Sequence, residues 1–310
     1  RFGKSTAADM LAAYYGRNED TSVLFERLKI GQEQSYQKHL NKYDVIKINM
    51  QEFLSMSESV EDMLNILQMR LIKDLKSAYP EVVSSDRLMF AMQDVFAETK
   101  CQFVILIDEW DCLFREYKQD KEAQKKYLDF LRMWMKDKEY VALAYMTGIL
   151  PIKKYGTHSA LNMFSEYSML NPREMAEFFG FTEKEVQELC SKYDRSFEET
   201  KAWYNGYSFE KIPSIYNPRS VVSCMRFGKI GNYWNQTETF EALQLYIDMN
   251  FEGLRDDILS MLAGEEVPVN TGSFTNDMAT FRTEDDVLTL LIHLGYLGYR
   301  YATKTVFIPN

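Results

Sequence analysis

The stretch CQFVILIDEW, from Cys101 to Trp110, decides the fold. Its first seven residues form an apolar, β-branched run, which is the composition of a strand buried on both faces. Two carboxylates, Asp108 and Glu109, end the run directly. Because a strand of this kind is typical of the centre of a parallel sheet, we predict that both carboxylates lie at the carboxyl edge of such a sheet. Open α/β sheets bind their ligands at that edge.

The flanking sequence alternates between strands and helices. Tyr43 to Met50 and Tyr140 to Thr147 repeat the strand pattern. The spacing of apolar residues predicts helices at Ser5–Tyr15, Val60–Tyr79, Arg87–Thr99 and Gln119–Asp137. The alternation indicates an α/β fold, in which a parallel sheet carries helices on both faces.

Beyond Pro151 the chain becomes mostly helical. Predicted helices are Asn171–Phe179, Thr182–Tyr193, Ser196–Tyr204, Pro218–Phe227, two within Glu238–Leu262, and Glu284–Leu294. Thr182 and Glu185 have the spacing of a capping box at a helix start. Tyr204–Tyr207 and Tyr216–Pro218 combine aromatic and turn residues, which favours a packed connection over base stacking.

The end of the chain predicts a hairpin from Tyr296–Tyr301 and Lys304–Ile308. Together with the preceding helices, this hairpin resembles a winged-helix unit. We therefore expect three parts: a sheet domain at residues 1–155, a helical linker or lid at 156–235, and a helical, winged-helix-like region at 236–310.

The charge and the composition of the chain exclude some classes of function. The 310 residues carry a formal net charge of −10, which argues against coating DNA or anionic lipid by bulk charge. The four cysteines have no CxxC spacing, so buried reduced thiols are expected rather than a zinc site. No apolar run is long enough to span a bilayer. We expect no membrane association and a cytoplasmic location.

The first residues, RFGKST, have the form of half a phosphate-binding loop. Consecutive amides at a helix start bind phosphate oxygens, a lysine neutralises their charge, and a Ser or Thr hydroxyl binds Mg2+. Gly3, Lys4, Ser5 and Thr6 supply the second half of such a loop. We expect a strand and the first half of the loop to precede Arg1. The alternative is that Lys4 is an ordinary exposed lysine at a helix start.

Asp108 and Glu109 complete the hypothesis, because phosphate-loop enzymes place Mg2+-binding carboxylates at the end of a buried strand downstream. In this interpretation Ser5 and Asp108 bind the metal, while Glu109 activates water. The alternative is a pair of carboxylates that leave a strand as it reaches solvent. Thr147, which ends the next strand, is either a sensor of the terminal phosphate or a locally bonded hydroxyl.

Three further side chains remain candidates. Asp111 is interpreted as the cap of the following helix, with binding of a basic partner as the alternative. Arg173 and Arg219 are candidates for a residue that neutralises transition-state charge, in this subunit or in a neighbouring one. A homo-oligomer is compatible with that role.

Six motifs in order resemble the bacterial AAA-ATPase-like family. They are RFGKST (Arg1–Thr6), VILIDEWDCLF (Val104–Phe114), YMTGILPIKK (Tyr145–Lys154), FFGFTEKEV (Phe178–Val186), WYNGYSF (Trp203–Phe209) and IYNPRSVV (Ile215–Val222). The resemblance implies a P-loop NTPase-like fold, with Lys4 and Ser5 in Walker A and Asp108 and Glu109 in Walker B. Trp110 stands where Tyr is more usual. The resemblance also implies a basic segment before Arg1 and, after a Phe-Ile-Pro-Asn segment, a fused nuclease domain whose cutting residues lie outside these 310 positions.

Two hypotheses for function follow. The first is an ATPase that uses ATP and Mg2+, with catalytic Glu109, Lys4 and Thr147, and that regulates the fused nuclease; DNA would be met only indirectly. The alternative is a nucleotide-dependent interaction module without significant hydrolysis. A third and weaker hypothesis is direct DNA binding by the last hairpin.

Overall fold

The computed structural model describes residues 2–151, 154–155, 158–159, 161–209, 211–233, 251, 253–272, 274, 281 and 283–309. Contacts divide the chain into two units. Ser5–Ile149 and Lys154–Phe164 form the first, which we call the sheet unit. Arg1–Lys4, Leu150–Lys153 and Ser165–Asn310 form the other, which we call the second unit.

The sheet unit is built on three parallel strands in the order β1-β2-β3. The strands are β1 (Asp44–Asn49), β2 (Phe103–Asp108) and β3 (Val141–Met146), so all three predicted strands are confirmed. The first five residues of β2 are at most 1% exposed. This burial follows from its central position and agrees with the two-faced apolar pattern of its sequence.

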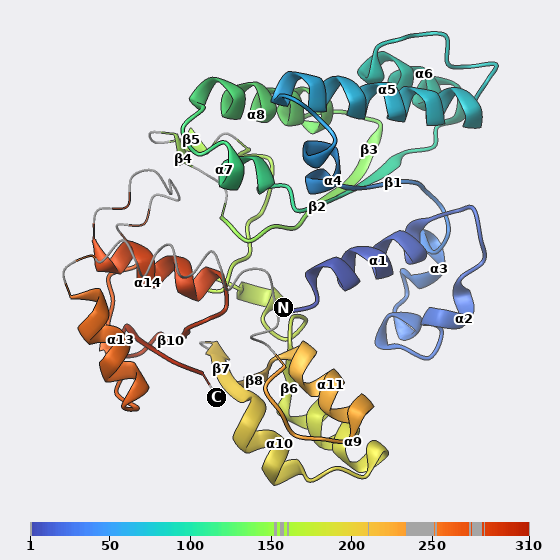
Figure 1. Ribbon diagram of the computed structural model, residues 1–310. Helices are drawn as coiled ribbons and strands as arrows, with labels where there is room; N and C mark the ends of the chain where they lie inside the picture. The colour runs from blue at the N-terminus through green and yellow to red at the C-terminus, as the bar shows by residue number, and fades with distance from the viewer. Residues whose placement is uncertain are drawn as a thin grey trace. The chain divides into compact units, whose positions relative to one another are not determined.

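Helices cover this sheet. They are α1 (Lys4–Tyr15), α4 (Met50–Ser55), α5 (Val60–Ala78), α6 (Leu88–Thr99), α7 (Cys112–Glu116) and α8 (Lys121–Met135). Figure 1 shows α5, α6 and α8 together on one side of the strands and α1 on the other. The layer of α5, α6 and α8 buries Leu67, Met92 and Trp134 completely. Side-chain caps from Ser59 and Asp120 start α5 and α8.

A small group of short elements lies between α1 and β1. It contains α2 (Ser22–Phe25), η1 (Lys29–Gln32) and α3 (Tyr36–His39). Tyr14 of α1 packs among Phe25, Tyr36 and Leu40, and its hydroxyl donates to the Tyr36 carbonyl at 2.8 Å. This cluster anchors the carboxyl half of α1.

The second unit begins with a three-stranded antiparallel sheet in the order β6-β8-β7. Its elements are η2 (Arg173–Met175), β6 (Phe181–Thr182), α9 (Glu183–Tyr193), α10 (Phe197–Tyr204), β7 (Asn205–Phe209), β8 (Ile212–Tyr216) and α11 (Pro218–Phe227). The capping box of Thr182 and Glu185 is confirmed at the start of α9.

One prediction in this segment is wrong, because the helix expected at Asn171–Phe179 is only the short η2. The connection expected around Tyr204 and Tyr216 is packed, as predicted, and it contains the strands β7 and β8. Phe2 packs in this unit against Tyr207, with ring centroids 4.9 Å apart. The aromatic residues of β7 are thus used for packing.

The last part of the second unit contains α13 (Leu254–Leu262), β9 (Val267–Pro268), α14 (Glu284–His293), β10 (Gly298–Arg300) and β11 (Thr305–Phe307). The strands pair in the order β10-β11-β9, which confirms the predicted hairpin. Of the two helices expected within Glu238–Leu262, α13 is observed, and the other lies largely outside the described residues. In addition, β4 (Lys154–Tyr155) pairs with β5 (His158–Ser159) in the sheet unit.

The cysteines agree with the expectation of reduced thiols. All four are free, with Cys112, Cys190 and Cys224 buried and Cys101 partly exposed. Burial raises the pKa of the Cys112 thiol to about 12, which makes it unreactive. Among the described helices, none is long and apolar enough to cross a membrane.

His293 predicts a specific pH dependence of stability. Burial, and then the charge of Lys4, lower its pKa from 6.5 to about 4. The unfolded chain therefore binds more protons than the folded chain in this window, and stability falls as pH drops from 6.5 towards 4. The expected loss is up to about 1.4 kcal/mol per pH unit. Urea titrations should show a shallower pH slope for His293→Leu than for the unaltered chain; equal slopes would contradict this assignment.

Candidate functional site

The predicted carboxylates lie at the carboxyl edge of the sheet, as their sequence position indicated. Asp108 is in register with Asn49 at the end of β1, and Ile107 with Met146 at the end of β3. This alignment brings Thr147 beside Asp108. The Thr147 hydroxyl donates to Oδ1 of Asp108, and the backbone N–H of Glu109 donates to the same oxygen at 3.0 Å.

The donor set at Asp108 fits a hard cation. Among the described residues, Oδ2 of Asp108 accepts no hydrogen bond, which leaves a carboxylate oxygen of the kind Mg2+ prefers. Burial and then the charge of Asp108 raise the pKa of the neighbouring Tyr145 to about 12. The described part of the chain contains no cluster of three or more His, Cys, Asp or Glu able to hold a metal. Mg2+ commonly keeps several waters and is held by one or two carboxylates together with phosphate oxygens.

Glu109 is held by an ion pair. Its backbone adopts the left-handed conformation with φ 52°, which is uncommon for a residue other than glycine. The Oε2 atom of Glu109 accepts a hydrogen bond from Nη2 of Arg115, 2.5 Å away. The side chains of Arg115 and Glu109 are 28% and 33% exposed. Arg115 was not identified from the sequence, because it lies on the five-residue α7 and no local pattern pairs it with Glu109.

Asp111 joins the ends of β2 and β3. Its side chain is fully buried, and Oδ2 accepts the backbone N–H of Ile149 at 2.9 Å. The interpretation of Asp111 as a helix cap is wrong, because it occupies the N-cap position of α7 without a side-chain cap bond. The Nε atom of Arg115 lies 3.9 Å from its Oδ1. Binding of a basic partner by Asp111 stays a prediction.

Further hydrogen bonds hold together the segments that follow β2 and β3. The N–H of Trp110 donates to the Thr147 carbonyl at 3.0 Å, and the Tyr127 hydroxyl donates to the Trp110 carbonyl at 2.8 Å. Gly148 is required by this close approach, since an added Cβ would lie 2.7 Å from both Asp111 Oδ1 and Trp110 Cδ1. The residues that follow β2 and β3 therefore form one packed assembly.

The half phosphate loop has the expected local form. Gly3 has φ +81°, a conformation that L side chains rarely adopt, and α1 begins at Lys4. Ser5 and Thr6 lie in the first turn of α1 and are exposed. Contacts assign Ser5 and Thr6 to the sheet unit with Asp108, whereas Gly3 and Lys4 belong to the second unit. Within the second unit, the charge of Lys4 acts on His293.

The candidate arginines lie elsewhere in the chain. Arg173 is in η2 and Arg219 is in the first turn of α11; both are exposed and both belong to the second unit. Their assignment as transition-state arginines stays a prediction.

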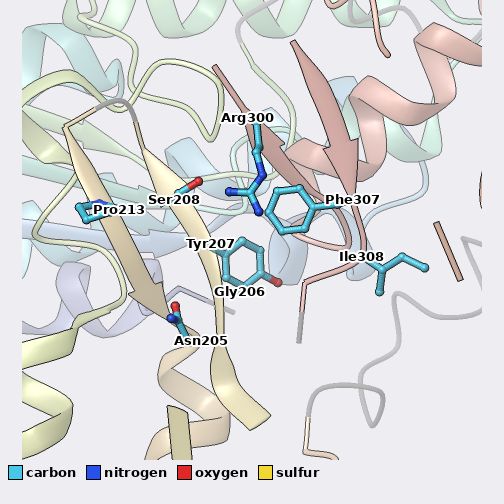
Figure 2. A pocket seen from close by; sticks show the side chains of 8 residues that line it. All are labelled: Asn205, Gly206, Tyr207, Ser208, Pro213, Arg300, Phe307 and Ile308. Carbon is cyan, nitrogen blue, oxygen red and sulfur yellow. The ribbon is translucent and has the colours of Figure 1, made fainter. Parts of the chain in front are cut away.

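A cavity of about 250 Å³ lies in the second unit, between the β7–β8 hairpin and β10–β11 (Figure 2). None of the predicted site residues lines it. Its cation, Arg300, pairs with Glu266 and lies 4.5 Å from the centroid of the Phe307 ring. Because this charge is already neutralised and the volume is below that of most ligand pockets, we do not assign a nucleotide to this cavity.

The fold is that of an α/β protein, and its parallel sheet with covering helices is compatible with a P-loop-like core. Residues 1–157 match the AAA-ATPase-like family, which is described as "Predicted AAA-ATPase". The chain belongs to this family. No curated protein and no solved structure matches it.

Gly148→Ala tests the packing of the two loops. The added methyl group would overlap Asp111 and Trp110, so one loop must shift at an expected cost of about 1–3 kcal/mol. Gly231→Ala is the matched control, because its Cβ would meet only the Tyr233 ring at 3.6 Å. Denaturant unfolding of both variants measures the difference. Equal stability of Gly148→Ala and the unaltered chain would show that the loops are loosely packed.

Proposed function

We propose that this chain binds ATP and hydrolyses it with Mg2+. The observation that carries the proposal is the pairing of Thr147 with Asp108 at the carboxyl edge of a central buried strand. Membership of a family described as predicted AAA-ATPases supports the nucleotide class. The loop from Gly3 to Thr6, at the start of α1, supplies a phosphate-binding element of the expected type.

In this proposal, each candidate residue of the site has one chemical role. Backbone amides from Gly3 to Thr6 bind the phosphates, and Lys4 neutralises their charge. Ser5 and Asp108 would hold Mg2+, which supplies charge neutralisation at the β- and γ-phosphate oxygens. Thr147 orients Asp108 and reads the terminal phosphate. Glu109 orients a water that attacks the γ-phosphorus; the bond to the β–γ bridging oxygen breaks, Glu109 accepts the water proton, and ADP and phosphate leave.

A second candidate is a nucleotide-dependent interaction module without significant hydrolysis. The observation that favours it is the ion pair of Glu109 with Arg115, because the carboxylate proposed as the base is already bound to a guanidinium. In either case, nucleotide binding would regulate a fused nuclease domain, as the family resemblance suggests, in a cytoplasmic protein that meets DNA only indirectly. A homo-oligomer could place Arg173 or Arg219 at a neighbouring site.

The end of the second unit supports a winged-helix proposal. The order β10-β11-β9, with α14 before the hairpin, suits such a unit within the region predicted at 236–310. In both sheets of the second unit, the third strand along the chain lies between the first and the second: β9-β11-β10 and β6-β8-β7. In the earlier sheet, α9 and α10 precede the hairpin. Both segments would then be interaction modules attached to the ATPase core.

Glu109→Gln tests hydrolysis. The amide cannot accept the proton, so turnover should fall about 100-fold or more while ATP binding is kept. Phosphate release and equilibrium ATP binding are measured on the same preparation, with Glu122→Gln on the exposed side of α8 as the control. Unchanged hydrolysis would remove Glu109 from its role. ATP binding without hydrolysis by the unaltered chain would favour the second candidate, and no binding would end both.

Direct DNA binding is expected to be absent. Helix α14 contains no Lys or Arg and buries every residue from Asp286 to His293, while Arg300 is paired with Glu266. The exposed residues of α10 include Glu198 and Glu199, which would repel phosphate. Fluorescence anisotropy with a labelled duplex at about 50 mM salt should show no saturable binding. Salt-dependent binding that is weakened by Arg300→Gln would revive the hairpin hypothesis.

A further inference from the structure

Arg115 connects the proposed base to the most rigid part of the site. Its guanidinium donates to Glu109 through Nη2, while its Nε lies near the buried carboxylate of Asp111. Asp111 is in turn fixed by the Ile149 N–H. Arg115 therefore hydrogen-bonds to Glu109 and lies within 3.9 Å of the buried carboxylate of Asp111.

The ion pair with Arg115 engages the carboxylate of Glu109, which is the proposed base of ATP hydrolysis. A base that orients water must place a carboxylate oxygen within hydrogen-bond reach of that water. Here Oε2 of Glu109 is 2.5 Å from the guanidinium nitrogen, and the Glu109 backbone is in the left-handed region. A residue other than glycine persists in that region only where surrounding contacts hold it. At Glu109, the backbone N–H bond to Asp108 and the side-chain pair with Arg115 are two such contacts.

We propose that Arg115 is a positioning residue that restrains Glu109 in the resting chain, and that the pair opens when the assembled nucleotide site or a partner draws Glu109 towards the attacking water. This inference rests on the proposed ATPase function and adds its regulation. Hydrolysis is slow at rest because only the fraction of molecules with an open pair carries a competent base.

The exposure of the pair suits a reversible restraint. Both side chains are about one-third exposed, and pairs of this kind contribute little to stability because water competes for both charges. A fully buried pair would be costly to separate. Removing the restraint should therefore raise basal turnover by a modest factor, about two- to fivefold.

The test compares Arg115→Gln with the unaltered chain in phosphate release at saturating MgATP. The expected result is a two- to fivefold rise in kcat with nearly unchanged ATP affinity. Arg70→Gln is the control for loss of an arginine ion pair, because Arg70 pairs with Asp74 on the exposed surface of α5. The double variant Arg115→Gln with Glu109→Gln should lose the gain entirely, since the gain acts through Glu109.

The outcomes separate this inference from the proposed function. A lower or unchanged kcat of Arg115→Gln, with ATP bound and Glu109→Gln inactive, overturns the restraint and leaves the ATPase standing. Failure of the unaltered chain to bind or hydrolyse ATP defeats the proposed function itself. If circular dichroism shows that Arg115→Gln is unfolded, Arg115→Met takes its place: it keeps an apolar stem, removes the charge that pairs with Glu109, and is judged by the same rise in kcat.

Discussion

The site depends on the hydrogen bond from the Ile149 N–H to the buried carboxylate of Asp111. A buried carboxylate is costly unless donors satisfy it, so this bond and the nearby Arg115 stabilise a group that would otherwise destabilise the core. The bond fixes the segment that follows β3 against the segment that follows β2. Because of it, Thr147 lies where its hydroxyl reaches Asp108, and Gly148 has no room for a side chain.

The sheet could be predicted from sequence because its signals are local. β2 is apolar on both faces and ends at Asp108, so its central place and the position of Asp108 followed from the local order of residues. The antiparallel strands β7 and β8 could not be predicted in the same way. They contain Asn205, Gly206 and Pro213, residues that favour turns. Pairing of β7 with β8, and of β8 with the more distant β6, overrides that preference.

The site was predictable in its acidic residues and not in their partners. Asp111 stands at the start of α7, where a capping role is the local expectation, but the amide of Ile149, distant in sequence, binds its carboxylate instead. Arg115 lies in a helix of five residues, too short for a clear periodic pattern, and its pairing depends on the left-handed turn at Glu109. Long-range hydrogen bonds and unusual backbone angles are the features that local patterns do not encode.

Two neighbouring carboxylates thus have different physical environments. Asp111 is fully buried and bonded to backbone, so moving it would expose an unsatisfied amide and disturb both loops. Glu109 is partly exposed and paired with a side chain, so its partner can be exchanged for water or for a ligand at little cost. In the proposed ATPase, the buried Asp111 would keep the segments after β2 and β3 in place while the partly exposed Glu109 exchanges its partner. This difference in burial is the physical reason why we propose Glu109, rather than Asp111, as the residue through which hydrolysis is regulated.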